Sequence, residues 1–208
     1  MTPDPDLHTH LLGIARGVSA SLHDALMRIG PVPVDPPTHA HVADRLALEV
    51  VNQQLSIRAA AAIWGRVEAA ALLQKLTPRD LFVEAHAETL RGCGLSGAKV
   101  RAVLAIRAAD EAGLFGPTLA TLAHPERSTI LRSIKGVGQW TADMIGIFHY
   151  GDPDIWPAGD VAAVGSLRRL TGCTDTQACA LPFAPYRSYL ARAMWRVRDL
   201  VPTPTLAA

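Results

Sequence analysis

Apolar residues recur every three or four positions along most of this chain, which is the spacing of one buried face of an α-helix. The first periodic segment, residues 7–29, predicts a single helix that ends at Gly30 and Pro31. Residues 31–37 contain four prolines and cannot continue a helix, so we expect an extended connector there.

The same periodicity continues from residue 41 to residue 200. Thr77, Pro78 and Asp80 predict a helix start, because a hydroxyl cap, a proline in the first turn and a carboxylate three residues after the cap all favour one. No run of alternating polar and apolar residues is long enough for a strand. The chain is therefore predicted to be all-α, with helices that include residues 57–73, 97–112, 125–131, 139–150, 161–170 and 186–200.

The length of 208 residues allows one large domain or two small helical lobes that share an interface. We expect residues 1–40 to form an N-terminal helix with its proline-rich connector, packed on the second lobe. Residues 41–208 then form the main helical domain.

Composition narrows the class of protein. Apolar residues make up 49% of the chain. Three cysteines without a Cys-x-x-Cys pair exclude a zinc ribbon and a four-cysteine iron–sulfur cluster, and the odd number is typical of a reducing cytoplasm. Residues 1–6 lack the basic and apolar segments of a signal peptide, and the longest run of small apolar residues, 59–63, is too short to span a bilayer. We therefore expect a cytoplasmic protein without membrane contact.

The charge is unevenly distributed. The net charge of +1 argues against a protein that coats nucleic acid by bulk attraction. Residues 1–51 carry three basic and six acidic side chains, whereas residues 127–208 carry nine basic and six acidic ones. This bias is compatible with a local phosphate-binding surface, and it is equally compatible with ordinary solvated helix faces.

The most specific local pattern is the segment 131–142, in which a helix ends, two glycines flank one apolar residue and a second helix begins. Gly136 and Gly138 allow a tight turn and the close approach of a partner. The unsatisfied amides at the start of the second helix then point outward beside the positive end of the helix dipole, where they can bind a phosphate of any nucleotide. An ordinary interhelical turn can also use Gly-x-Gly, so the short pattern alone leaves both interpretations open.

A second candidate is Asp160, which a loop containing proline and glycine delivers to the start of the helix expected at residues 161–170. Aspartate is a common helix cap, so Asp160 could serve only as a cap. A capping geometry also fixes the side chain rigidly, however, so a structural and a chemical role can coexist.

Together, the two candidates resemble the helix-hairpin-helix DNA glycosylases. Residues 131–142 are similar to the hairpin of that superfamily along their whole length, and Gly159-Asp160, about twenty residues further on, is similar to its catalytic signature. The resemblance covers about residues 40–200. It implies two helical lobes with the active-site cleft between them, and it makes residues 41–208 the glycosylase domain.

The resemblance implies that Asp160 is the catalytic carboxylate, facing C1′ of a nucleotide that has been turned out of the duplex. The chemistry needs an anion there, because breaking an N-glycosidic bond passes through an oxocarbenium-like sugar that a fixed carboxylate stabilises. The same group can orient the attacking water. An alkylated purine is already cationic and leaves readily, so a separate general acid is dispensable.

For the hairpin, the resemblance implies backbone contacts to DNA from five residues, namely Gly136, Val137, Gly138, Gln139 and Thr141. It also implies a structural Na⁺ or K⁺ that bridges to DNA and is held by the backbone carbonyl oxygens of Arg132, Ile134 and Val137. No other cofactor is expected.

Superfamily members that also cleave the DNA strand carry a lysine two residues past the second hairpin glycine, where it attacks C1′. This chain has Trp140 there, and Lys135 lies before Gly136, so we expect no lyase activity. Residues 139–142 resemble the 3-methyladenine DNA glycosylase II branch, and residues 51–66 and 185–195 support that branch. The best-known bacterial form has an additional N-terminal α/β domain, so we expect a compact form here.

The branch resemblance implies a base pocket formed by Trp140, Trp195 and Met144. Electron-rich aromatic faces favour cationic purines. Trp195 could instead pack in the core, and Trp140 could pack behind the hairpin. Met144 stands where the bacterial form has an aromatic residue, which implies a roomier pocket, and Gly159 replaces an acidic neighbour.

Family members insert an apolar side chain into the gap left by the flipped base, from the loop that matches residues 94–97. The aligned position is Gly97, which has no side chain to insert, so we take Leu95 as the wedge and Gln54 as a plug from the other side. Leu95 as a buried loop anchor is an equally good interpretation.

The resulting expectation is a monomeric, monofunctional DNA glycosylase of base excision repair, which removes bases of the 3-methyladenine and 7-methylguanine type from double-stranded DNA. One alternative is a non-catalytic hairpin module that only binds DNA, although such a module has no need of Asp160. Another is a glycosylase with a different lesion preference, such as hypoxanthine, ethenoadenine or 1-methyladenine.

Overall fold

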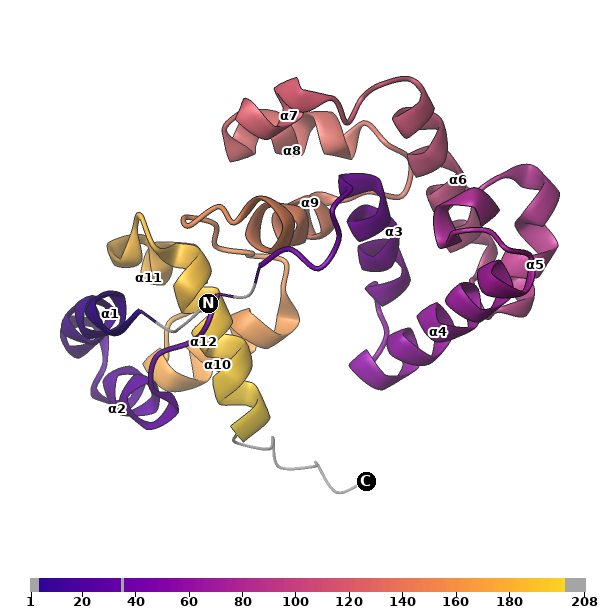
Figure 1. Ribbon diagram of the computed structural model, residues 1–208. Helices are drawn as coiled ribbons and strands as arrows, with labels where there is room; N and C mark the ends of the chain where they lie inside the picture. Colours follow the sequence, from indigo (N-terminus) through magenta and orange to yellow (C-terminus); the bar gives the residue numbers. More distant parts are fainter. Residues whose placement is uncertain (1–3, 35, 201–208) are drawn as a thin grey trace. The chain divides into compact units, whose positions relative to one another are not determined.

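Every regular element in the described part of the chain is a helix, which confirms the all-α prediction (Figure 1). The computed structural model describes residues 4–34 and 36–200. Residues 1–3 and 201–208, at the outer ends of the two expected domains, and Asp35 of the expected connector lie outside the described residues. None of the described helices combines the length and the apolar character that a membrane crossing needs.

The chain divides into two compact units. One unit combines Met1–Pro36 with Gly151–Ala208, and the other is the continuous segment Pro37–Tyr150. We call them the discontinuous unit and the continuous unit. The N-terminal helices thus share a unit with the C-terminal ones, although the whole continuous unit separates them in sequence.

The discontinuous unit is a helical bundle around its own core. Leu22 and Leu26 of α2 are buried in one apolar cluster with Leu167 of α10 and Met194 of α12. Burial of such an apolar stripe is the main source of stability for amphipathic helices. The helices of this unit are α1 (Pro5–Val18), α2 (Ala20–Ile29), α10 (Val161–Thr171), α11 (Thr176–Ala180), the 3₁₀ turn η4 (Leu181–Phe183) and α12 (Arg187–Leu200).

The single helix expected over residues 7–29 is wrong, because the structure breaks it at Ser19. This residue has extended backbone angles, φ −165° and ψ 134°. Its hydroxyl oxygen accepts a hydrogen bond from the amide of Leu22 (3.4 Å) and donates one to the carbonyl of Leu170 (2.7 Å). A serine that finds such partners offers the backbone an alternative to a continuous helix.

The continuous unit is built around α3. Val42, Leu46 and Val50 lie at four-residue intervals on one face of α3 and are buried with Val103 of α6 and Ala142 of α9. The helices of this unit are α3 (Val42–Asn52), α4 (Ile57–Leu73), η1 (Pro78–Leu81), η2 (Glu84–His86), α5 (Ala87–Gly92), α6 (Gly97–Glu111), α7 (Pro117–Thr121), α8 (His124–Arg132), α9 (Gln139–Ile145) and the π-helical turn η3 (Gly146–Tyr150).

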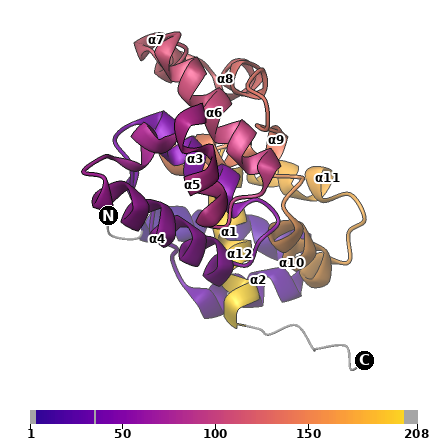
Figure 2. The ribbon, with the colours of Figure 1, turned by 90° about the vertical axis from the view of Figure 1, so that its right-hand side faces the viewer.

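Within the continuous unit, α7 and α8 lie at one end and α4 at the other, as both views show (Figures 1 and 2). The helix start expected at Thr77 produces only the short 3₁₀ turn η1. The Asp80 carboxylate accepts hydrogen bonds from the Thr77 hydroxyl (2.6 Å) and amide (2.8 Å), and these bonds lower the pKa of Asp80.

Candidate functional site

The Gly-x-Gly turn joins α8 to α9 in the continuous unit. Gly136 has φ +89°, and a Cβ on it would lie 2.4 Å from the Cβ of Ala102 on α6. Only glycine fits this position, because the backbone is left-handed and the turn rests directly on α6. At Gly138, no neighbouring atom lies within 4 Å of the point that a Cβ would occupy, so the backbone here is open to a partner.

The start of α9 supplies hydrogen-bond donors. Gly138 is its N-cap residue, and no side chain caps the helix. The first-turn amides of such a helix need partners from outside it, and they carry the positive end of the helix dipole. This start can therefore bind an anionic group of a partner.

The side chains of Gln139 and Thr141 hold the hairpin together. The Gln139 side chain accepts a hydrogen bond from Arg132 (3.0 Å) and donates one to Asp143 (2.7 Å). Thr141 is 1% exposed, and its hydroxyl accepts a hydrogen bond from Gln53 (2.8 Å). Thr141 is thus buried within the hairpin, whereas Gln139 is exposed and its side chain is fixed by these hydrogen bonds.

Three residues that sequence reasoning assigned no role support the hairpin. Asp143 is buried and lies 3.0 Å from Nε2 of His124 in addition to its bond with Gln139. Gln53 donates to the carbonyl of Gly136 (3.1 Å) as well as to Thr141. Lys99 then donates to the carbonyl of Gln53 (2.9 Å). These bonds join residues far apart in sequence, and no local pattern signals them.

The turn between α3 and α4 carries the expected plug. Gln54 is exposed and has φ +56°, a backbone conformation that few residues other than glycine adopt. Lys99 fixes this turn, because its ammonium group also donates to the carbonyl of Val51 (2.7 Å). Burial lowers the pKa of Lys99. The exposed side chain of Gln54 is thus presented from a rigid turn.

Leu95, the expected wedge, is 4% exposed and lies in the apolar core of the continuous unit. This is the place that the interpretation as a buried loop anchor assigns to it. Gly97 follows at the start of α6.

Asp160 is half-buried at the start of α10 and acts as the N-cap of that helix. Its Oδ1 accepts a hydrogen bond from the amide of Ala163 (2.8 Å) and another from the indole Nε1 of Trp195 (2.8 Å). The preceding loop is anchored by the buried residues Trp156 and Pro157, and the Asp160 amide donates to the carbonyl of Pro157 (2.8 Å). The carboxylate is therefore oriented by two hydrogen bonds, and the backbone that carries it is fixed by a third.

The structure brings Asp160 together with one of the expected pocket residues. Trp195 is half-buried on α12 and donates its indole N–H to the carboxylate. Trp140, also half-buried, and Met144, which is 3% exposed, lie on α9 in the continuous unit.

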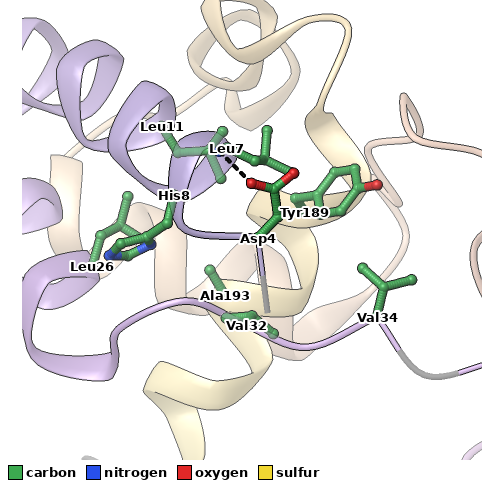
Figure 3. Close-up of a pocket in the computed structure, with 9 residues that line it drawn as sticks. All are labelled: Asp4, Leu7, His8, Leu11, Leu26, Val32, Val34, Tyr189 and Ala193. Atoms are coloured by element: carbon green, nitrogen blue, oxygen red, sulfur yellow. Dashed lines mark hydrogen bonds between the residues drawn. The ribbon is translucent and has the colours of Figure 1, made fainter. Parts of the chain in front are cut away.

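A pocket with a volume of about 90 Å³ lies elsewhere in the discontinuous unit (Figure 3). Its walls are mostly aliphatic. The Asp4 carboxylate accepts hydrogen bonds from the backbone amides of Asp6 and Leu7 at the start of α1 (both 3.0 Å). No expected site residue is among its lining residues, which are Asp4, Leu7, His8, Leu11, Leu26, Val32, Val34, Tyr189 and Ala193. This pocket is a packing gap between α1, α2, the connector and α12.

Comparison with known proteins gives relatives that are named as DNA glycosylases or DNA repair enzymes. No protein-family model matches the chain. The chain is 29% identical over 166 residues to DNA-3-methyladenine glycosylase 1 of Schizosaccharomyces pombe. The matched residues make up 76% of this chain and 72% of that protein. The chain is 26% identical over 184 residues to the alkylbase DNA glycosidase-like protein mag2 of the same yeast, with coverage of 83% and 85%.

Solved structures share the fold. The S. pombe 3-methyladenine DNA glycosylase in complex with abasic DNA superposes with a TM-score of 0.81 at 23% identity, over 91% of this chain and 97% of that one. The DNA-3-methyladenine glycosidase of Bacillus halodurans gives a TM-score of 0.69 at 29% identity, over 88% and 86%. The chain is thus similar in sequence and in fold to 3-methyladenine DNA glycosylases, in agreement with the resemblance of its hairpin to that of the helix-hairpin-helix DNA glycosylases.

Proposed function

We propose that this protein is a DNA glycosylase that hydrolyses the N-glycosidic bond of alkylated bases in duplex DNA, with Asp160 as its catalytic carboxylate. The observation that carries the proposal is the double hydrogen bond to Oδ1 of Asp160, from Ala163 and from Trp195. A carboxylate held in this way does not have to reorient when positive charge develops beside it, and such preorganisation is the main source of electrostatic catalysis.

The reaction follows from that placement. The bond between C1′ and the base nitrogen breaks, and its electron pair leaves with the base. An alkylated purine such as 3-methyladenine or 7-methylguanine carries a positive charge and leaves as a neutral molecule. The Asp160 carboxylate stabilises the positive charge on the sugar, and a water molecule then adds to C1′ and releases its proton to the carboxylate or to solvent.

Strand binding is assigned to the hairpin. The uncapped start of α9 and the open backbone at Gly138 support phosphate binding through main-chain amides, which is independent of base sequence. The amide of Val137 is already used by the carbonyl of Ile134 (3.0 Å) and Thr141 is buried, so the exposed residues Gly138 and Gln139 are the stronger donors of the expected set.

A monovalent cation at the hairpin fits the donor chemistry. The expected ligands are the carbonyl oxygens of Arg132, Ile134 and Val137, and neutral oxygens suit a hard cation of low charge. The carbonyl of Ile134 accepts one hydrogen bond and has a second lone pair for an ion. Such an ion would add positive charge beside the bound phosphate. Among the described residues, no group of acidic, histidine or cysteine side chains offers a competing metal site.

For the base pocket, the hydrogen bond between Trp195 and Asp160 supports a role for this indole beside the reacting sugar. An aromatic face there would stack on a cationic purine. Trp140 and Met144 are proposed as base-pocket residues on the resemblance of residues 139–142. Gln54 is the better candidate for filling the gap in the duplex, because it is exposed whereas Leu95 is buried.

We also propose that the enzyme is monofunctional, of the 3-methyladenine DNA glycosylase II type, and acts as a monomer in the cytoplasm. Position 140 is a tryptophan, which cannot form a Schiff base with C1′.

The variant Asp160→Asn tests the catalytic role. Its amide oxygen can still accept from Ala163 and Trp195, so the fold is retained while the negative charge is lost. We expect release of 3-methyladenine from alkylated duplex DNA to fall at least about a hundredfold, with binding to the same duplex retained. The same reactions, run without alkali, report lyase activity as strand cleavage, and we expect none.

Undiminished release by Asp160→Asn would remove this residue from the mechanism. DNA binding by the wild-type protein without release of any base from a panel of lesion-bearing duplexes would favour the non-catalytic hairpin module. Release of hypoxanthine or ethenoadenine in preference to 3-methyladenine would change the substrate and leave the mechanism intact.

A further inference from the structure

Three arginines gather around the loop that joins α5 to α6. Arg91 Nη2 and Arg101 Nη1 lie 3.3 and 3.5 Å from the point that a Cβ on Gly97 would occupy. Arg66 Nη2 lies 2.8 Å from the corresponding point on Gly94. The arginines come from α4, α5 and α6, so the fold assembles the cluster from separate elements. We call these residues the arginine cluster.

The positive charge of the cluster is poorly neutralised within the protein. Arg91 has Glu88 at 3.6 Å, but both side chains are largely exposed, at 58% and 89%. Arg66 and Arg101 are exposed, and neither has a carboxylate within 4 Å among the residues that the structure describes. Like charges brought close together raise the free energy of the folded state unless an anion lies near them.

Arg66, one member of the cluster, is held in place by hydrogen bonds between its residue and the loop. Arg66 Nε donates to the carbonyl of Cys93 (2.7 Å), and the Cys93 thiol lies 3.4 Å from the carbonyl of Arg66. Gly97 is half-buried, and the guanidinium groups of Arg91 and Arg101 lie in contact range of the point that its Cβ would occupy. Gly97 therefore lets two positive groups from α5 and α6 approach the same point of the loop.

The cluster shares a rigid frame with the hairpin. Ala102, which follows Arg101 on α6, is the residue on which Gly136 of the hairpin turn rests. Lys99, on the first turn of the same helix, donates to the carbonyl of Gln53, and Gln53 donates to the carbonyl of Gly136. A partner bound at the hairpin thus has a fixed relation to the arginine cluster within the continuous unit.

We propose that Arg91 and Arg101, with Arg66 beside them, bind phosphates of the DNA backbone and form a second phosphate-contact site apart from the hairpin. The guanidinium group is planar, permanently charged and able to donate two parallel hydrogen bonds to a phosphate. The site grips DNA without reading its sequence. This inference rests on the proposed function only in taking duplex DNA as the ligand.

The test is the salt dependence of binding to an undamaged duplex by the variant Arg91→Ala/Arg101→Ala. Each phosphate contact contributes about 0.9 to the slope of log K against log salt concentration. We expect the double variant to lose between one and two units of this slope and to bind about tenfold more weakly at low salt. The variant Arg91→Lys/Arg101→Lys should regain most of the slope, because it restores the charge, with an affinity between the two.

The matched control is Arg16→Ala/Arg28→Ala, which removes two exposed positive charges from the discontinuous unit. It should keep the wild-type slope. Circular dichroism and thermal melting check that all variants are folded, which is expected because the substituted side chains are exposed. A wild-type slope in Arg91→Ala/Arg101→Ala, or an equal loss in the control, overturns the proposal.

Base release is measured on the same proteins. If the wild-type protein releases no base but the salt-dependence slope falls in Arg91→Ala/Arg101→Ala, the arginine cluster is supported as a DNA-binding site and the proposed function is contradicted. If the wild-type protein releases alkylated bases and the salt-dependence slope is unchanged in Arg91→Ala/Arg101→Ala, the proposed function is supported and the DNA-binding role of the arginine cluster is contradicted.

Discussion

Trp195 connects α12 to Asp160 through a hydrogen bond from its indole to a carboxylate oxygen. Asp160 could be singled out from the sequence, because a loop residue at a helix start has a local signature. Its bond with Trp195 could not, because the two residues are 35 positions apart and helical periodicity indicates only which face of a helix is buried.

The variant Trp195→Phe tests this bond. It keeps an aromatic ring and loses the N–H donor, so Oδ1 of Asp160 keeps the bond from Ala163 and loses the one from the indole. A hydrogen bond to a charged group contributes about 1.5–3 kcal/mol, so we expect kcat/KM for 3-methyladenine release to fall about ten- to a hundredfold. Most of the loss should be in kcat, because the bond orients the reacting group.

Trp156→Phe is the matched control. It removes the same N–H group from Trp156, a buried residue of the loop before Asp160, whose indole donates to the hydroxyl of Thr176 on α11 (3.4 Å). This variant should be less stable to heat and should release base at close to the wild-type rate at a temperature where it is folded. Equal losses of kcat in the two variants would mean that Trp195 acts only through packing.

At the scale of elements, the hairpin was the most predictable feature and the helix breaks were the least predictable. Two glycines around one apolar residue are a local signal, and the structure has α8 ending at Arg132 and α9 beginning at Gln139. The break at Ser19 depends on the carbonyl of Leu170, which is 151 positions away. The π-helical turn at Gly146–Tyr150 replaces the last part of the helix expected over residues 139–150, again without a local signal.

The two hairpin glycines are expected to have different roles, Gly136 in stability and Gly138 in DNA binding. In Gly136→Ala, the new methyl group meets Ala102 and the backbone keeps a strained positive φ, so we expect a loss of about 2 kcal/mol or more in the free energy of unfolding. In Gly138→Ala, nothing lies within 4 Å and φ is −99°, so stability should change by less than about 0.5 kcal/mol.

DNA binding should show the opposite pattern, because Gly138→Ala, which hardly changes stability, should weaken it. The methyl group of Gly138→Ala stands where DNA is proposed to approach the backbone, so this variant should bind undamaged duplex several-fold more weakly while melting like the wild-type protein. Urea unfolding and fluorescence anisotropy measure the two quantities. A stable Gly136→Ala variant, or wild-type DNA affinity in Gly138→Ala, would contradict the assignment of the turn.

At the scale of the whole molecule, the all-α class followed from periodicity alone, since every described element is helical. No pattern in the sequence predicted how the chain divides into its two units. Residues 1–36 and 151–208 belong together because the apolar faces of α1 and α2 pack with α10 and α12, and a sequence pattern identifies an apolar face without identifying its partner.

Stability against acid is expected to depend on His149 in the continuous unit. Burial, together with the positive charges of Arg45 and other neighbours, lowers the pKa of His149, whose Nδ1 is buried without a hydrogen-bond partner. The unfolded chain therefore binds a proton at a higher pH than the folded protein. Stability should fall as the pH drops through about 6.5, and this loss should end below the folded-state pKa.

The variant His149→Phe keeps a ring against Tyr150 and removes the titrating group. Its melting temperature should depend less on pH between about 7.5 and about 5 than that of the wild-type protein, as differential scanning calorimetry can measure. His10→Phe, a substitution of an exposed histidine in the other unit, should keep the wild-type dependence. A curve for His149→Phe that parallels the wild-type curve would rule out this source of acid sensitivity.

The discontinuous unit has a consequence for biosynthesis. α1 and α2 leave the ribosome before Pro37–Tyr150, but the helices that cover Leu22 and Leu26 come after that segment. At ordinary elongation rates the ribosome needs roughly 5 to 20 seconds to translate the intervening residues, which is ample time for the continuous unit to fold first. The nascent chain thus carries an uncovered apolar surface throughout this interval, which makes its first thirty residues a natural target for chaperones.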